Sequence, residues 1–211
     1  MNQILILTAL AYVGGGIPIG LLAGKLFRGI DIREFGSGNI GASNVWRTLG
    51  WPLGITVFIL DVLKGFVPVF YASLHPQFTG WPVIAVGIAA IMGHNFSPFL
   101  RFKGGKGVAT SLGVTIGLAP LAGLIGFGLW GVLLLITRYI SVSSMVTTPL
   151  VCLLIWHHNH STLPYALFGV ATTFFVLYTH RSNVARLRKG TEPKVGKKKV
   201  IATPDTNGPV P

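Results

Sequence analysis

The longest apolar stretch of the chain, VATSLGVTIGLAPLAGLIGFGLWGVLLLIT at residues 108–137, decides how the fold is assigned. A helix needs about 20 apolar residues to cross a bilayer. These 30 residues can therefore form either one tilted helix or two short helices that turn near Pro120. The choice matters because it determines on which side of a membrane all the following loops lie.

The composition around this stretch is that of a membrane protein. Of the 211 residues, 51% are hydrophobic and only 10% are charged, whereas soluble domains carry about 25% charged residues. Further apolar segments occupy most of the remaining chain, and we expect one polytopic domain with no separate soluble domain. These segments are residues 4–26, 52–72, 81–96, 144–156 and 163–179.

The basic residues are unevenly distributed. The formal net charge is +12, but the Lys and Arg residues fall in short clusters between apolar segments. This pattern is typical of cytoplasmic loops and does not indicate a nucleic-acid-binding face. A binding site for anionic substrates is compatible with the same clusters. The one cysteine, Cys152, lies inside an apolar segment and implies neither a disulfide nor a metal site.

The charge distribution also decides how often residues 108–137 cross the membrane. Two crossings give seven spans and place the basic clusters on one side, whereas one crossing places them on both sides. Because the side rich in Lys and Arg is cytoplasmic, we predict an all-α fold of seven transmembrane helices, amino terminus out and carboxyl terminus in. At least one helix of this stretch must then be short and shielded by its neighbours. The transmembrane domain is assigned to residues 1–193, and residues 194–211 are expected to form a basic, disordered cytoplasmic tail.

One charged pair, Asp61 and Lys64, lies well inside the segment 52–72, one helical turn apart. Ionisable groups at that depth are costly and often functional. The pair is explained either as an intramembrane ion pair that joins helices or as a support for an active site.

A small, polar, glycine-rich segment, GSGNIGASNVWR, occupies residues 36–47. Its glycines permit positive φ angles, successive free amides can form an anion-binding concavity, and a guanidinium suits phosphate. The segment is not a P-loop, because it lacks G-K-[ST] and no strand precedes it. It is either a flexible loop or a phosphate site with candidate ligands Ser37, Gly38, Asn39, Ser43, Asn44 and Arg47.

A second glycine-rich segment, FKGGKG, occupies residues 102–107, just before the long apolar stretch. Amides at a helix amino terminus attract anions, although the lysines are also explained as membrane anchors. Two such loops on one side of the membrane favour a ligand that carries phosphate. The candidate ligands here are Lys103, Gly104, Gly105 and Lys106.

Histidines complete the candidate site. His94, at the end of the segment 81–96, is either a satisfied interfacial residue or a candidate base or hydrogen-bond donor beside the two loops. His180 and Asn183 are three residues apart and share one face at the end of the last span. The histidines at 157, 158 and 160 lie on the opposite side without carboxylate or cysteine partners, so no metal site is assigned.

Absent motifs narrow the class of protein. Five acidic residues are too few for a carboxylate-based magnesium site, and the chain contains neither a His-x-x-x-x-Asp nor a Gly-x-Ser-x-Gly motif. We therefore expect no metal and no cofactor.

Three co-linear motifs, GSGNIGASNVWR, GHNFSPFLRFKGGKGVAT and HRSNVARLRKGTEP, closely resemble those of the bacterial acyl-phosphate:glycerol-3-phosphate acyltransferases of the PlsY type. The likeness runs from about Tyr12 to Pro193 and includes DVLKG in the second span. Ser43 departs slightly, because the family often has threonine there. The tail after Lys194 matches nothing known to us.

The resemblance implies a seven-span fold in the bacterial cytoplasmic (inner) membrane, with its active site facing the cytoplasm. It implies transfer of a fatty acyl group from acyl phosphate to the 1-hydroxyl of sn-glycerol 3-phosphate, giving lysophosphatidic acid and phosphate, the first committed step of phospholipid synthesis. The expected partners are acyl phosphate, glycerol 3-phosphate and membrane lipid, and the oligomeric state stays open.

The chemistry of the candidate residues suits this reaction. Acyl phosphate is an activated mixed anhydride, so positioning and charge stabilisation can lower most of the barrier without a covalent enzyme nucleophile. The first loop with Arg47 would hold one phosphate, and the two lysines with the glycine amides of the second loop would hold the other. His180 and Asn183 would bind glycerol 3-phosphate.

Two residues are candidates for catalysis. His94 would orient or deprotonate the glycerol hydroxyl, although the substrate's own phosphate could also act as the base. Ser37 is an alternative as an acylated nucleophile, but no base is its evident partner in the sequence.

A transporter of a small phosphorylated or anionic solute is the alternative function. Short broken spans, glycine-rich loops and an intramembrane ion pair would suit one. Against it, the motifs gather at one face of the membrane rather than at its midplane, and the sequence shows no internal repeat.

Overall fold

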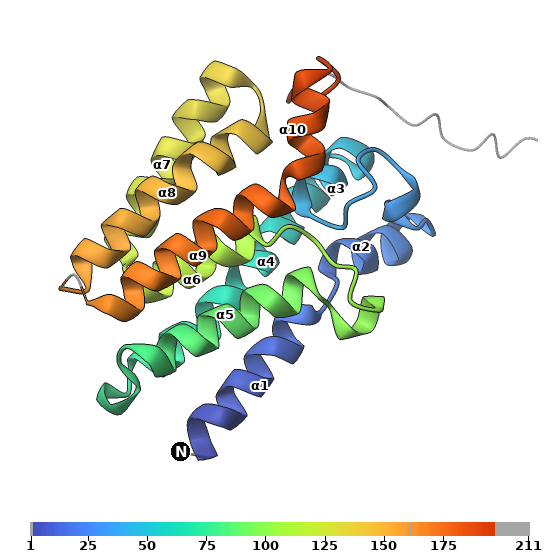
Figure 1. Cartoon of the computed structure of the whole chain (residues 1–211). Coiled ribbons are helices and arrows are strands. Elements are labelled where there is room, and N and C mark those ends of the chain that lie inside the picture. Colours follow the sequence, from blue (N-terminus) through green and yellow to red (C-terminus); the bar gives the residue numbers. More distant parts are fainter. Residues whose placement is uncertain (1, 161, 197–211) are drawn as a thin grey trace, which may run out of the picture.

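The protein is helical throughout the part that the computed structural model describes, residues 2–160 and 162–196. Within these ranges ten α-helices follow one another (Figure 1): α1 (Asn2–Gly16), α2 (Ile19–Arg28), α3 (Ala42–Leu49), α4 (Trp51–Ser73), α5 (Trp81–Asn95), α6 (Val108–Leu118), α7 (Pro120–Thr137), α8 (Ile140–His158), α9 (Leu163–Thr179) and α10 (Arg181–Arg188). Three short 3₁₀ turns connect them: η1 (Ile32–Glu34), η2 (Pro76–Phe78) and η3 (Pro98–Leu100). The predicted disordered tail lies outside the described residues from residue 197 onward.

Several of these helices are suited to a bilayer. Five described segments are long and apolar enough to cross it, and α9 with α10, which meet at 52°, would make a sixth if they form one bent span. The multi-pass, all-helical fold is thereby confirmed, whereas the count of seven crossings and the orientation of the termini stay predictions. The five segments are Asn2–Arg28, Trp51–Ser73, Trp81–Leu100, Pro120–Thr137 and Ile140–His158.

The 30-residue apolar stretch forms two helices, α6 and α7, which break at Ala119 just before Pro120. Helix α6 has only 11 residues and packs directly on α4. A Cβ built on Gly113 would lie 1.9 Å from the carbonyl oxygen of Val62, and one on Gly65 would lie 2.2 Å from that of Thr110. Small residues therefore let the two backbones touch, and the short helix is shielded by its neighbours as the sequence predicted.

The first span is broken between α1 and α2 at Ile17–Pro18. Proline lacks a backbone N–H and clashes with the preceding turn, which frees carbonyl groups there. Two side chains satisfy them: the Ser97 hydroxyl donates to Gly16 O at 2.6 Å, and Lys64 Nζ donates to Ile17 O at 3.1 Å. Lys64 also pairs with Asp61 at 2.8 Å, so the intramembrane ion pair joins α4 to the broken first span.

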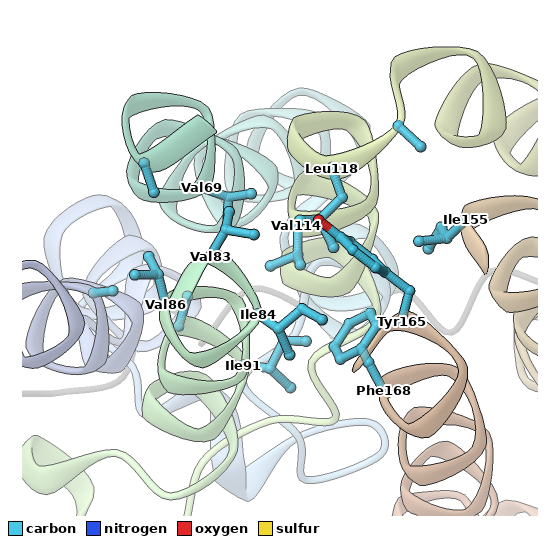
Figure 2. Close-up of a cluster of buried hydrophobic side chains, with 14 of the residues drawn as sticks. Val69, Val83, Ile84, Val86, Ile91, Val114, Leu118, Ile155, Tyr165 and Phe168 are labelled. Carbon is cyan, nitrogen blue, oxygen red and sulfur yellow. The ribbon is translucent and has the colours of Figure 1, made fainter. Parts of the chain in front are cut away.

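The apolar core lies where α4, α5, α6, α8 and α9 meet, with contributions from α1 and α7 (Figure 2). Its fully buried side chains include Ile84, Val114 and Ile155. Side chains on the outer surface are also apolar, as with Leu135, which is 81% exposed. Such a surface suits contact with lipid rather than water.

The polar motifs gather at one end of the bundle, the end that carries α3 and α10 (Figure 1). A second, smaller core cluster fixes α3 and the turn before it. Ile32 and Val45 are fully buried in this cluster, and Ile40 is 4% exposed. The glycine-rich segment between η1 and α3 is therefore anchored at both ends.

Candidate active site

Asn44 organises the first glycine-rich loop from inside. Its side chain is fully buried, and its Nδ2 donates to the carbonyl oxygens of Ile32 at 3.1 Å and Phe35 at 3.0 Å. Its Oδ1 accepts the backbone N–H of Ser37 at 2.8 Å. Asn44, a predicted ligand, has both amide hydrogens engaged and instead holds the loop in shape.

Other amides of this loop are also engaged. The N–H of Gly38 donates to Phe35 O at 3.0 Å, and that of Gly41 donates to Asn39 Oδ1 at 2.9 Å. The side chains of Ser37, Asn39 and Ser43 are half-buried at the loop surface. This loop can present these polar side chains to a ligand, whereas the amides of Ser37, Gly38 and Gly41 are already engaged.

The second glycine-rich loop closes the carboxyl end of α5. The N–H of Gly104 donates to Asn95 O at 2.9 Å, and that of Gly105 donates to His94 O at 3.0 Å. These bonds satisfy carbonyl groups that the end of a helix leaves without partners. Both amides are therefore engaged within the protein, and the role of Gly104 and Gly105 as phosphate ligands stays a prediction.

Glycine is required at both positions by lack of space. A Cβ on Gly104 would lie 2.0 Å from His94 O, and one on Gly105 would lie 2.1 Å from His94 Nε2. Any side chain would push the loop away from α5. The glycines thus set the position of the residue that follows, Lys106.

The two lysines of this loop have different surroundings. Lys103 is exposed, whereas Lys106 is half-buried and its Nζ donates to Asn183 Oδ1 on α10. Burial, with Arg186 and Arg47 nearby, lowers the pKa of Lys106 to about 8. Lys106 therefore reaches the bundle's polar end as a cation at neutral pH, and Lys103 does not join it.

Glu192 connects the elements around Lys106. This carboxylate is 7% exposed and accepts hydrogen bonds from Asn183 Nδ2 at 2.6 Å, Ser141 Oγ at 2.7 Å and Arg186 Nε at 2.8 Å. Burial alone raises its pKa, but these hydrogen bonds outweigh burial and hold the pKa below its usual value. Glu192 therefore stays ionised and ties α10 to the start of α8.

Arg47 supplies a third cation from α3. Burial lowers its pKa most; the nearby carboxylate of Glu192 raises this pKa, and the nearby cation of Arg186 lowers it. A guanidinium nevertheless stays charged at any ordinary pH. Its Nε is buried and has no hydrogen-bond partner among the described residues. We call Arg47, Lys106, Arg186 and Glu192 the cationic cluster; its three cations outnumber its one carboxylate.

His180 borders the cationic cluster at the bend between α9 and α10. It is 2% exposed, and it lies close enough to Lys106 and Glu192 to interact with both charges. Its Nδ1 lies 2.8 Å from Val176 O, which assigns the ring proton of the neutral form to Nδ1. Nε2 is then left as an acceptor for a hydroxyl group.

His94 lies elsewhere. It is 4% exposed, and its Nδ1 is 3.7 Å from Asp61 Oδ1, while Gly105 covers its Nε2. The imidazole therefore sits between the Asp61–Lys64 pair and the second loop. The structure brings Arg47, Lys106, His180 and Asn183 together as predicted, but it turns His94 toward the bundle interior.

Three residues of the site were not selected from the sequence: Ser141, Arg186 and Glu192. All three lie in polar segments beside predicted spans, at RYISVSS and HRSNVARLRKGTEP. The sequence feature that could have pointed to them is their position in a polar segment at the end of a predicted span. Their partners, however, lie as much as 51 residues away, so no local pattern identifies them.

Comparisons with known proteins show the family of this chain. Residues 5–190 match the family model described as glycerol-3-phosphate acyltransferase. A protein of that name from Synechococcus elongatus is 42% identical over 93% of this chain and 96% of its own length. Its namesake from Staphylococcus carnosus is 40% identical over 92% of this chain and 98% of its own length.

Solved structures give the same result. The crystal structure of PlsY, an integral membrane glycerol 3-phosphate acyltransferase, in its glycerol 3-phosphate form has a TM-score of 0.87 and 37% identity, over 92% of this chain and 96% of that chain. The lysophosphatidic acid form has a TM-score of 0.84 and 36% identity, with the same coverage. Together, these matches show that the chain belongs to the glycerol-3-phosphate acyltransferase family of integral membrane proteins.

Proposed function

We propose that this protein transfers a fatty acyl group from acyl phosphate to the 1-hydroxyl of sn-glycerol 3-phosphate at the cytoplasmic face of the bacterial inner membrane. As a member of its family, it is a membrane glycerol-3-phosphate acyltransferase, and its product is lysophosphatidic acid. The choice of donor, the membrane face and the roles of individual residues are the parts that we propose.

One observation carries the assignment of the site. Arg47 from α3, Lys106 from the second loop and Arg186 from α10 converge around a single buried carboxylate. Charged donors held in a partly buried site bind phosphate strongly, because they are already desolvated and oriented. Both proposed reactants carry phosphate, and the cationic cluster can hold the phosphoryl groups beside each other.

Positioning of glycerol 3-phosphate would fall to His180 and Asn183. His180 Nε2 is placed to accept a hydrogen bond from a substrate hydroxyl, because Nδ1 is committed to Val176 O. Asn183 bridges Lys106 and Glu192, so a ligand bound at Lys106 lies beside it. We assign His94 to support of the second loop rather than to the base.

The chemistry needs no covalent enzyme intermediate. The 1-hydroxyl oxygen attacks the acyl carbon, the bond between that carbon and the phosphate oxygen breaks, and inorganic phosphate leaves. The hydroxyl proton passes to His180 Nε2 or to a substrate phosphate oxygen. Cations near the departing phosphate stabilise its charge in the transition state. Ser37 and its loop would bind a phosphoryl group rather than become acylated.

The orientation follows from charge. With seven crossings, counting α6 and α9 as spans, the loops and helix ends rich in Lys and Arg share one side. That side is cytoplasmic by the positive-inside rule. The cationic cluster lies on it, which also argues against the transporter alternative, since transporters place their sites near the midplane.

A two-substrate assay tests the donor. Purified protein with palmitoyl phosphate and glycerol 3-phosphate is expected to release phosphate only when both are present. Palmitoyl-CoA and acyl-carrier protein are offered as rival donors with the same acceptor. Turnover with either rival but none with palmitoyl phosphate would overturn the proposed donor, and a protein that turns over none would not be an acyltransferase.

A further inference from the structure

A long apolar cavity runs through the bundle between α6, α7, α8 and α9, with one wall from α4. Its volume is about 90 Å³, which makes it a narrow cavity. Along α8 its lining extends from Ser144 to Ile155, a rise of about 16 Å for a helix. The cavity is therefore long enough to hold an extended chain rather than a compact ligand.

The outer end of this cavity lies one helical turn from the cationic cluster. On α6, the lining begins at Val108, two residues after Lys106. On α8 it begins at Ser144, one turn after Ser141, which donates to Glu192. On α9 it ends at Val176, whose carbonyl oxygen accepts from His180. A cationic cluster that leads into an apolar cavity matches a molecule with an anionic head and an apolar tail.

The inner end is closed by the core. Ile155 from α8 and Phe168 from α9 line it, and they are 1% and 4% exposed. Figure 2 shows both side chains directed toward the packed core near Val114 and Tyr165. A chain that reaches these two residues cannot extend further without displacing packed side chains.

The side of the cavity that faces α4 and the lipid is walled by aromatic rings. Phe58 and Phe127 stack at 6.0 Å, and Phe127 and Trp130 stack at 6.1 Å. All three rings line the cavity, and Phe127 is 45% exposed on the outer surface. These three rings therefore form one aromatic wall of the cavity.

We propose that Ile155 and Phe168 set the upper limit of acyl-chain length, by closing the inner end of the cavity that holds the tail of the acyl donor. The inference rests on the proposed function, because it takes a long-chain acyl phosphate as the occupant. Moving a tail from lipid into this cavity gains little, since both surroundings are apolar. Selection therefore comes from steric exclusion by a close-packed core, which does not yield easily.

Thr172 offers a way to shorten the cavity. It lies on α9 between Phe168 and Val176, four residues from each, so the three form one stripe along the cavity. A phenylalanine there would block the cavity about halfway, and Thr172 is only half-buried. Val170 on the same helix is 56% exposed on the outer surface, and Val170→Phe is the matched control.

The experiment measures kcat/KM for acyl phosphates of 8 to 18 carbons, by phosphate release in detergent micelles. Thr172→Phe is expected to lower kcat/KM for hexadecanoyl phosphate roughly tenfold or more, the effect of overpacking. For octanoyl phosphate, kcat/KM of the variant should stay within about twofold of the wild-type value, because this shorter chain ends before the block. Phe168→Ala, if it folds, is expected to raise the ratio of octadecanoyl to hexadecanoyl turnover.

The outcomes separate this inference from the proposed function. The inference is wrong if Thr172→Phe lowers kcat/KM by the same factor for acyl phosphates of every chain length. It is also wrong if Val170→Phe shifts the chain-length preference as much as Thr172→Phe does. An unchanged profile in Thr172→Phe also overturns it. A wild-type protein that releases phosphate from no acyl phosphate would instead contradict the proposed donor.

Discussion

The two glycine-rich loops look alike in the sequence but use their glycines differently. In the loop before α3, Gly36 and Gly38 adopt positive φ angles of 61° and 70°, and the loop is shaped by the buried Asn44 amide. In the loop before α6, Gly104 and Gly105 are pressed against the end of α5, where no side chain fits. One loop needs glycine for its backbone angles and the other needs it for space.

The comparison bears on how the proposed site would bind anions. In both loops several amides are not free to bind an anion, because those of Ser37, Gly38, Gly41, Gly104 and Gly105 already bond to the protein. What the loops contribute instead is position: one leads into α3 with Arg47, and the other carries Lys106. Charged side chains, rather than backbone amides, should therefore supply most of the affinity for phosphate.

The largest expected effect separates the two lysines of the second loop. Lys106→Met should lower kcat/KM by roughly 100- to 1,000-fold, the cost of removing one preorganised transition-state donor. In Lys103→Met, kcat/KM should stay within about threefold of the wild-type value, because an exposed cation contributes little. Steady-state kinetics on purified protein checks both, and an equal loss in the two variants would contradict the assignment.

A single methyl group tests whether the second loop needs glycine for space. Gly105→Ala places a Cβ against His94 Nε2 and should displace Lys106, with a loss of about 100-fold for a shift near 1 Å. Gly128→Ala on α7 is the control, because nothing lies within 4 Å of its Cβ. Circular dichroism should show the same helix content in both. Full activity in Gly105→Ala would refute the argument from lack of space.

Neutralising Glu192 tests how the cationic cluster is held. Glu192→Gln keeps the shape but weakens hydrogen bonds to a charged acceptor, and we expect a stability loss of about 1.5–3 kcal/mol with a raised KM for glycerol 3-phosphate. Thermal unfolding and kinetics measure the two effects. Glu34→Gln, at an exposed position of η1, should change neither. An unaltered melting temperature in Glu192→Gln would show that the carboxylate does not tie α10 to α8.

The smallest effect is expected from pH. The lowered pKa of Lys106, about 8, means that its amine is charged below pH 8 and loses its proton above it. KM for glycerol 3-phosphate should rise by up to about tenfold per unit above that point. Lys106→Arg keeps its charge and should move the rise to higher pH. An alkaline limb identical in both proteins would assign it to another group.

Much of the fold could be predicted because the lengths of the apolar segments, and the charges of the loops between them, can be read directly from the sequence. The break at Pro120 was predicted because the charge distribution favours two crossings, and the shielding of α6 was predicted because 30 residues are too few for two full-length helices. The break at Pro18 was missed, because the segment 4–26 has the length of one span, although Pro18 itself is a local signal for a break. The side chains that bind the freed carbonyls come from α4 and from the loop after α5, far from Pro18 in the sequence.

The site was predicted in part for a similar reason. Residue chemistry identified Arg47, Lys106, His180 and Asn183, but it could not show which groups were already bonded. The carbonyls of His94 and Asn95 compete for the glycine amides, and Glu192 gathers its partners across distant segments. Such competition depends on tertiary packing, which no local pattern records.

The central claim is that cations of the cationic cluster, and not the net positive charge of the protein, hold the phosphoryl group. Calorimetric titration of glycerol 3-phosphate tests it with two double variants that remove the same charge. Arg47→Met with Lys106→Met should abolish measurable binding, whereas Lys25→Met with Lys103→Met, both at exposed positions, should keep Kd within about threefold. Equal weakening in the two double variants, or no weakening in the first, would contradict the account.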